Sequence, residues 1–180
     1  RSLAGNTEEY SDAAFSISGE VASRLTKIEV SPNCFDWLSW ANKHNIDPIV
    51  KAYLSIYPGD IIKDAKDKDG NYDPAISLTP RNWERSISSE LKIARKVGDY
   101  PRLDRNMDDD TRKQFEDFID KYFSVGIEEI LKGNFNDIDL FELDFSKQQF
   151  IVNCLVVTAY TEEEIINAMN FIRKFNMSEY

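Results

Sequence analysis

The sequence predicts a mainly α-helical fold, with a short α/β segment only at its N-terminal end. Beyond residue 30 the apolar residues recur at intervals of three and four, the spacing that places them on one face of a helix. Alternation of apolar and charged residues, which is typical of a half-buried strand, is confined to residues 27–30. We therefore expect an α/β remnant at 1–30, a helical domain at 31–98 and a helical extension at 99–180.

The N-terminal remnant is predicted to hold two pieces of strand. Residues 1–5 are expected to be the end of one strand, and a polar loop follows them. Residues 16–24 are predicted to form a short helix or turn that leads into the strand at 27–30. The chain starts with Arg1 rather than Met and reaches the end of a strand at once, so we expect it to belong to a longer protein.

The first helix of the helical domain is predicted to start at Ser31-Pro32-Asn33, because serine and asparagine are favoured helix caps. Trp37 and Trp40 lie on this helix and cannot both face one core, so one of them is expected to cover an interface. The apolar stripe is predicted to contain Phe35, Leu38 and Ala41.

A second helix is predicted to begin at Asp47-Pro48 and to end near Pro58-Gly59. The charged segment 63–74 is predicted to be a loop. Its Asp67–Asp73 stretch resembles part of a calcium-binding loop. The first and last positions of such a loop need acidic residues but would fall on Ala65 and Ile76 here, which favours a solvated loop.

The third helix is the most clearly signalled, with Thr79 as its cap and Pro80 at its first position. Gly98 lies directly after its predicted end, where glycine is favoured. Its apolar stripe is predicted to contain Trp83, Ile87, Leu91 and Ala94.

The C-terminal extension is predicted to be helical throughout. One helix follows the acidic residues Asp108–Asp110, which suit a helix N-terminus. A buried helix is expected at 146–157, and a strand is the alternative there because the end of this segment is rich in valine. The last helix is expected to begin with a capping box at Thr161–Glu164 and to bury three residues. These three are Ile165, Met169 and Ile172.

Composition and charge exclude several classes of protein. A net charge of −10 argues against a nucleic-acid-binding surface, which needs clustered lysine and arginine. Cys34 and Cys154 are predicted to be buried free thiols, and no Cys/His cluster predicts a metal site. No apolar run reaches the roughly 20 residues of a membrane span, so we expect a cytoplasmic protein without membrane contact.

Arg81 is the residue on which the functional interpretation depends. Two positions along a helix correspond to about 200° of rotation, so Arg81 is predicted to point away from Trp83 and the core. Arg85, Ser88 and Lys92 are predicted to share its face. A guanidinium held at the start of a capped helix suits a phosphate, but the helix by itself favours an ordinary solvent-exposed arginine.

Several segments in order then point to one family. They are Leu3-Ala4-Gly5-Asn6, Val21-Ala22-Ser23-Arg24-Leu25, Asp36-Trp37-Leu38-Ser39-Trp40-Ala41, Ile46-Asp47-Pro48, Ala52-Tyr53-Leu54 and Thr79-Pro80-Arg81-Asn82-Trp83-Glu84. Over residues 1–98 the chain resembles the C-terminal half of AAA+ ATPases of the MoxR-like, dynein-related group. The resemblance implies a remnant of the α/β P-loop core followed by the helical lid.

The resemblance also implies roles for three residues. Asn6 looks like the sensor-1 residue that orients the attacking water, and Arg24 looks like the arginine finger that reaches the neighbouring subunit's nucleotide. Arg81 looks like sensor 2, the lid arginine that contacts the nucleotide. The family usually has Asn-Arg-Phe around the finger, whereas this chain has Ser23-Arg24-Leu25. The complete protein is expected to use ATP and Mg²⁺, to form a homo-oligomeric ring, namely a hexamer, and to work beside a von Willebrand factor A domain protein.

The chain lacks the parts that hold the phosphates themselves. No G-x-x-x-x-G-K-[ST] loop occurs, so this chain alone is expected to hold no nucleotide and to be inactive. The alternative is a non-enzymatic helical adaptor or regulator that binds another protein through residues 99–180, because that region carries no motif of the family.

Overall fold

The computed structural model describes residues 32–66, 69–136, 138 and 143–177. The chain divides into two units, Arg1–Ser31 and Pro32–Tyr180. The expectations for 1–30, including both strands, lie outside the described residues. In the described part the fold is mainly helical, as predicted, and its only β structure consists of two isolated bridges, Lys63–Leu78 and Lys66–Tyr72.

Helix α2 spans Cys34–Ala41 and starts at the predicted cap. The Asn33 side chain accepts hydrogen bonds from the backbone N–H groups of Phe35 and Asp36. The predicted stripe is wrong at Phe35, which is 66% exposed. Cys34 takes its place beside Leu38 and Ala41, and its thiol donates to the Leu54 carbonyl over 3.4 Å.

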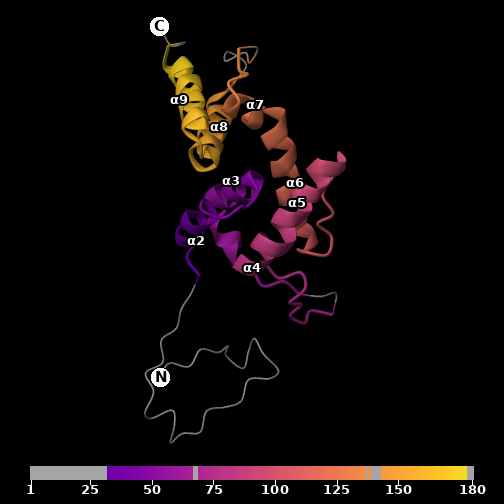
Figure 1. Cartoon of the computed structure of the whole chain (residues 1–180). Helices are drawn as coiled ribbons and strands as arrows, with labels where there is room; N and C mark the ends of the chain where they lie inside the picture. The colour runs from indigo at the N-terminus through magenta and orange to yellow at the C-terminus, as the bar shows by residue number, and fades with distance from the viewer. Residues whose placement is uncertain (1–31, 67–68, 137, 139–142, 178–180) are drawn as a thin grey trace, which may run out of the picture. The chain divides into compact units, whose positions relative to one another are not determined.

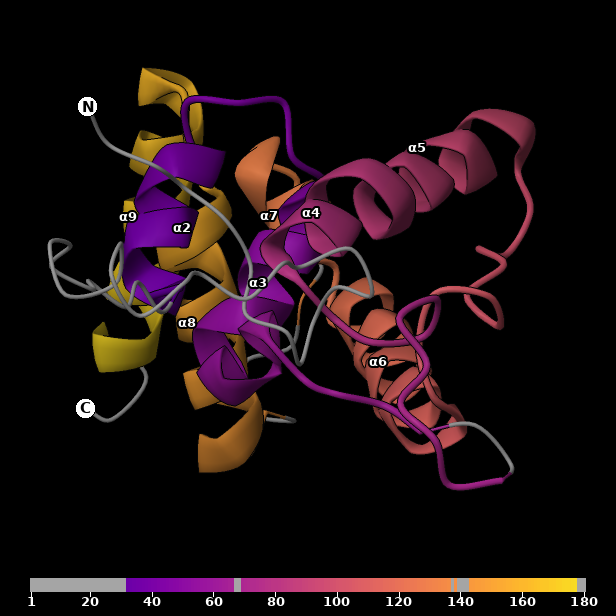
Figure 2. The ribbon, with the colours of Figure 1, turned by 90° about the horizontal axis from the view of Figure 1, so that it is seen from below.

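Helix α3, Pro48–Ile56, is the central helix, followed by the short 3₁₀ turn η2 at Pro58–Ile61. Figure 2 shows α3 between α8 and α6, and it also contacts α2. A helix surrounded in this way has to be apolar on most sides. Five of its apolar residues are accordingly buried, namely Ile49, Val50, Ala52, Tyr53 and Leu54, and the charged Lys51 is buried with them.

The predicted third helix is present but contains a π-helical turn. It runs through α4 (Pro80–Asn82), the π turn η3 (Trp83–Ile87) and α5 (Ser88–Val97), and Gly98 ends it with φ 72°. The predicted stripe is buried as expected. The predicted exposure of Ser88 is wrong: Ser88 is 1% exposed. In the π turn the Ser88 N–H bonds to the Trp83 carbonyl, which brings Ser88 above Trp83 on the core side.

Helix α6, Asp109–Ser124, begins as predicted at the acidic residues. The Asp108 side chain caps it by accepting from the Thr111 N–H over 3.0 Å. Helical spacing would place Phe123 with the buried Phe115, Phe118, Ile119 and Tyr122, but Phe123 is 48% exposed. Gly126, with φ 70°, then turns the chain into the short helix α7, Ile127–Leu131.

Helices α8 (Phe145–Thr158) and α9 (Glu162–Met177) lie side by side (Figure 1). Because α8 extends to Thr158, its valine-rich end is helical and the alternative of a strand is wrong. The capping box of α9 is present, because Glu164 accepts from the Thr161 N–H over 2.9 Å while the Thr161 hydroxyl accepts from the Glu164 N–H over 3.2 Å.

The predicted core face of α9 is wrong at two of its three residues. Ile165 and Met169 are 45% and 50% exposed, whereas Ile172 is partly buried against the core, as predicted. Ala168 and Phe171 are buried in place of the other two. Both sets have helical spacing, so periodicity does not choose between them. A contact with α7 distinguishes the two sets. The Asn167 side chain donates to the Leu131 carbonyl over 2.9 Å, which fixes the rotation of α9.

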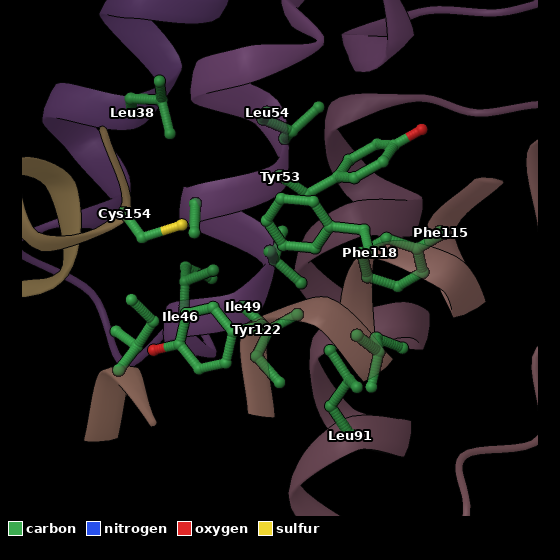
Figure 3. Close-up of a cluster of buried hydrophobic side chains, with 14 of the residues drawn as sticks. Leu38, Ile46, Ile49, Tyr53, Leu54, Leu91, Phe115, Phe118, Tyr122 and Cys154 are labelled. Atoms are coloured by element: carbon green, nitrogen blue, oxygen red, sulfur yellow. The ribbon is translucent and has the colours of Figure 1, made fainter. Parts of the chain in front are cut away.

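The core joins the predicted domain at 31–98 to the predicted extension. Tyr53 of α3 packs edge-on against Phe115 and Phe118 of α6, with ring centroids 4.7 and 5.3 Å apart, as Figure 3 shows. The contact of α3 with α8 adds further buried side chains. Residues from both sides of position 98 thus share one core.

Both cysteines are buried free thiols, as predicted. Cys34 is 6% exposed and Cys154 is fully buried. No helix in the described part of the chain is long and apolar enough to span a membrane.

Candidate functional site

Arg81 is the second residue of α4, whose start is held by side-chain hydrogen bonds. The Thr79 hydroxyl accepts from the Asn82 N–H over 3.2 Å. The Asn82 side chain in turn donates to the Ser77 carbonyl over 2.7 Å. These bonds fix the position from which Arg81 projects.

The Arg81 side chain is directed away from the core. Trp83, two residues later, is fully buried, and its indole N–H donates to the Asp60 carbonyl over 2.8 Å. Arg81 itself is exposed and makes no hydrogen bond or ion pair with the described residues.

A shallow groove of about 280 Å³ lies beside Arg81. It is lined by Trp37 and Trp40 of α2 and by Pro80, Arg81 and Glu84. The two indole centroids are 6.0 Å apart. This groove was not predicted from the sequence, but the presence of two tryptophans on one short helix was its visible signal.

Local contacts hold the tryptophan wall of the groove in place. The His44 ring stacks on Trp40 with centroids 4.0 Å apart. The His44 Nδ1 atom lies 2.7 Å from the Trp40 carbonyl oxygen, within hydrogen-bond distance. Trp37 and Trp40 are both half-buried and both pack against the core, contrary to the expectation that they cannot both face it.

The groove offers one guanidinium and two indole rings, beside the carboxylate of Glu84. A planar guanidinium binds phosphate oxygens through paired hydrogen bonds, and indoles provide apolar walls. Its volume lies just below the roughly 300–1,000 Å³ of typical small-molecule pockets. The groove can supply a phosphate contact and one wall, and the remainder of any nucleotide site has to come from another part of the protein.

The other two predicted site residues, Asn6 and Arg24, lie outside the described residues. The structure therefore does not test whether they approach Arg81. Among the described residues no group of three His, Cys, Asp or Glu side chains is arranged to hold a metal ion.

A cluster of charged side chains around the buried Asp47 joins the helices α3, α5 and α7. Asp47, the cap of α3, is fully buried and accepts from the Arg95 guanidinium over 2.9 Å. Arg95 also forms an ion pair with Glu128 of α7 over 3.2 Å. The Ser88 hydroxyl accepts from the Asp47 N–H over 2.9 Å. We name Asp47, Arg95 and Glu128 the ionic cluster.

Burial dominates the electrostatics of the ionic cluster. Burial raises the pKa of the Asp47 carboxyl above its ordinary value, although the positive charge of Arg95 acts in the opposite direction. One Asp47 oxygen, Oδ2, is buried without a hydrogen-bond partner among the described residues. The sequence indicated Asp47 only as a helix start, because the partners lie far away along the chain.

Comparisons with known proteins add no relative to this picture. No family model matches the chain, and searches among curated proteins and among solved structures find nothing similar to it.

Proposed function

We propose that residues 31–98 form the lid of an AAA+ ATPase of the MoxR-like, dynein-related group, and that Arg81 is its sensor-2 arginine. The observation that carries this proposal is the position of Arg81. It projects from the first turn of a capped helix, it faces away from a buried tryptophan, and it has no partner among the described residues. An unpaired guanidinium held in this way is ready to contact a phosphate that another part of the protein binds.

The complete protein would bind ATP and Mg²⁺ through a phosphate-binding loop outside this chain. Asn6 would orient the attacking water, and Arg24 would reach the nucleotide of a neighbouring subunit in a hexameric ring. Arginine fingers in related phosphoryl-transfer enzymes contribute roughly 10³–10⁵ in rate. ATP hydrolysis would drive the remodelling of a partner, with a von Willebrand factor A domain protein as the expected co-worker.

The proposal is tested by ATP hydrolysis with the complete protein. The double variant Arg24→Ala with Arg81→Ala is expected to lose hydrolysis. A second double variant, Arg85→Ala with Arg105→Ala, removes the same charge from two exposed positions and is expected to hydrolyse ATP normally. Normal hydrolysis by the Arg24/Arg81 variant would refute the proposed roles.

The second candidate is a helical module that binds another protein. Exposed apolar side chains on the last two helices and in the turn between them favour it, since exposed apolar surface often marks interaction sites. They are Val156, Tyr160, Ile165, Ile166 and Met169, with exposures of 45–71%. If the complete protein does not hydrolyse ATP, the ATPase proposal fails and this second candidate remains.

A further inference from the structure

A second hollow in the structure shares no residue with the groove beside Arg81. It lies between Leu91–Arg95 of α5, the connector Asp99–Pro101 and Ile119–Phe123 of α6, and Ile49 closes it from α3. We name it the α5–α6 cleft. Its volume is about 220 Å³, below the roughly 300–1,000 Å³ of typical small-molecule pockets. A cleft of this size suits one long side chain better than a cofactor.

The interior and the rim of the cleft differ in character. Ile49, Leu91 and Ile119 are at most 2% exposed and form an apolar floor. Tyr100 and Phe123 at the rim are 45% and 48% exposed, so their rings are accessible from solvent. A side chain with an apolar stem and a polar head matches this arrangement, because the stem can be buried while the head stays at the rim.

The rim carries negative charge. Asp99 and Asp120 line it and are both exposed. Burial raises the pKa of the Tyr100 hydroxyl to about 12, and the negative charge of Asp120 contributes to the shift. Glu116 and Asp117 of α6 act in the same direction. The mouth of the cleft is therefore a place of negative potential that attracts a cation.

Among the described residues, Arg95 is the one cation that lines the cleft, and its charge is already neutralised. Arg95 is paired with Asp47 and with Glu128, at 2.9 and 3.2 Å. Its guanidinium also lies over the Phe123 ring, 6.0 Å from the centroid. With two carboxylates on one guanidinium, the ionic cluster adds no net positive charge that would repel a second cation.

We propose that the α5–α6 cleft receives one lysine or arginine side chain from a basic segment of a partner protein. The methylene stem packs on Leu91 and Ile119, and the charged head lies at the rim between Asp99 and Asp120. The rings of Tyr100 and Phe123 add cation–π attraction. The chain's net charge of −10 draws a basic segment toward this surface. This inference does not depend on the proposed ATPase role.

The test uses the whole 180-residue chain and n-pentylammonium as the probe, at low salt, followed by amide NMR shifts. We expect saturable shifts at Tyr100, Asp120 and Phe123 with a dissociation constant in the millimolar range. The neutral probe n-pentanol, which has the same stem, is expected to bind at least about fivefold more weakly. Equal binding of both probes, or shifts spread evenly over all acidic surfaces, would overturn the proposal.

A matched set of variants tests whether the rim carboxylates are responsible for the binding of n-pentylammonium. Asp120→Asn and Asp99→Asn are each expected to raise the dissociation constant of n-pentylammonium at least about threefold. The asparagine retains the acceptor that Asp99 offers to the Tyr100 N–H, so the connector keeps its shape. Asp110→Asn removes a charge from the exposed first turn of the same helix and is expected to bind as the original chain does. Unchanged binding by Asp120→Asn would contradict the assignment.

Discussion

Arg95 donates to the Oδ1 atom of Asp47 over 2.9 Å, and Asp47 is fully buried. These residues are 48 positions apart. Arg95 lies near the end of α5, and Asp47 caps the start of the central helix α3. Because Arg95 also reaches Glu128 of α7, one guanidinium connects the predicted lid to the predicted extension.

Replacing Arg95 by alanine is expected to destabilise the fold. The change leaves the carboxylate of Asp47 buried without its cation, which typically costs about 3–5 kcal/mol. Because Arg95 is one-third exposed, we expect the lower end of that range. Urea unfolding measures the effect. Arg85→Ala, which removes an exposed arginine from the same helical element, is expected to change the unfolding free energy by less than about 0.5 kcal/mol.

The ionic cluster also predicts a pH dependence. Burial raises the pKa of Asp47 in the folded state, so the folded chain holds the Asp47 proton more tightly than the unfolded chain does. The stabilising contribution of the protonated form is fully present below the ordinary value of 3.8 and is lost as the pH rises through the folded pKa.

The variant Asp47→Asn isolates this contribution. Relative to the variant, the unfolding free energy of the original chain is expected to fall as the pH is raised from about 4 toward neutrality. Urea unfolding at a series of pH values measures the difference. A difference that rises with pH would show that the Arg95 attraction outweighs burial.

Ser88 is predicted to matter because it satisfies a buried donor. Ser88→Ala leaves the Asp47 N–H buried without its acceptor, which costs about 1–3 kcal/mol. The neighbouring Ser89 is exposed, so Ser89→Ala serves as the control. Thermal unfolding of both variants tests the prediction, and equal effects would speak against the role given to Ser88.

The two thiols are expected to be unreactive in the folded chain. Burial raises the pKa of Cys154 to about 12 and also raises that of Cys34. Compared with the ordinary thiol pKa of 9.0, this rise reduces the thiolate fraction of Cys154 about a thousandfold. A disulfide reagent at pH 8 should therefore react slowly with the folded chain and rapidly with both thiols in urea. Fast reaction of one equivalent without denaturant would contradict this burial.

Local chemistry explains which parts of the fold the sequence predicted correctly. Asn33, Asp47, Thr79, Asp108 and the Thr161–Glu164 box cap their helices as expected, because a cap depends on residues within one turn. The stripe from Trp83 to Ala94 is buried for the same reason: its spacing is an internal property of the helix.

Features that depend on distant partners were not predictable in this way. The exposed face of α9 is set by the bond from Asn167 to Leu131, and the position of Ser88 is set by a π turn that no residue type specifies. In the candidate site, the outward direction of Arg81 followed from helix geometry. The groove beside it requires α2 to pack near α4, which the sequence does not state.

The central claim is that Arg81 contacts a nucleotide phosphate in the complete protein. The most direct test is steady-state ATP hydrolysis by Arg81→Ala beside Arg85→Ala, one turn further along the same helix. A lost charged hydrogen bond of about 1.5–3 kcal/mol corresponds to a roughly ten- to hundredfold fall in rate. We predict such a fall for Arg81→Ala and an unchanged rate for Arg85→Ala. Equal rates for both variants and the original protein would contradict the claim.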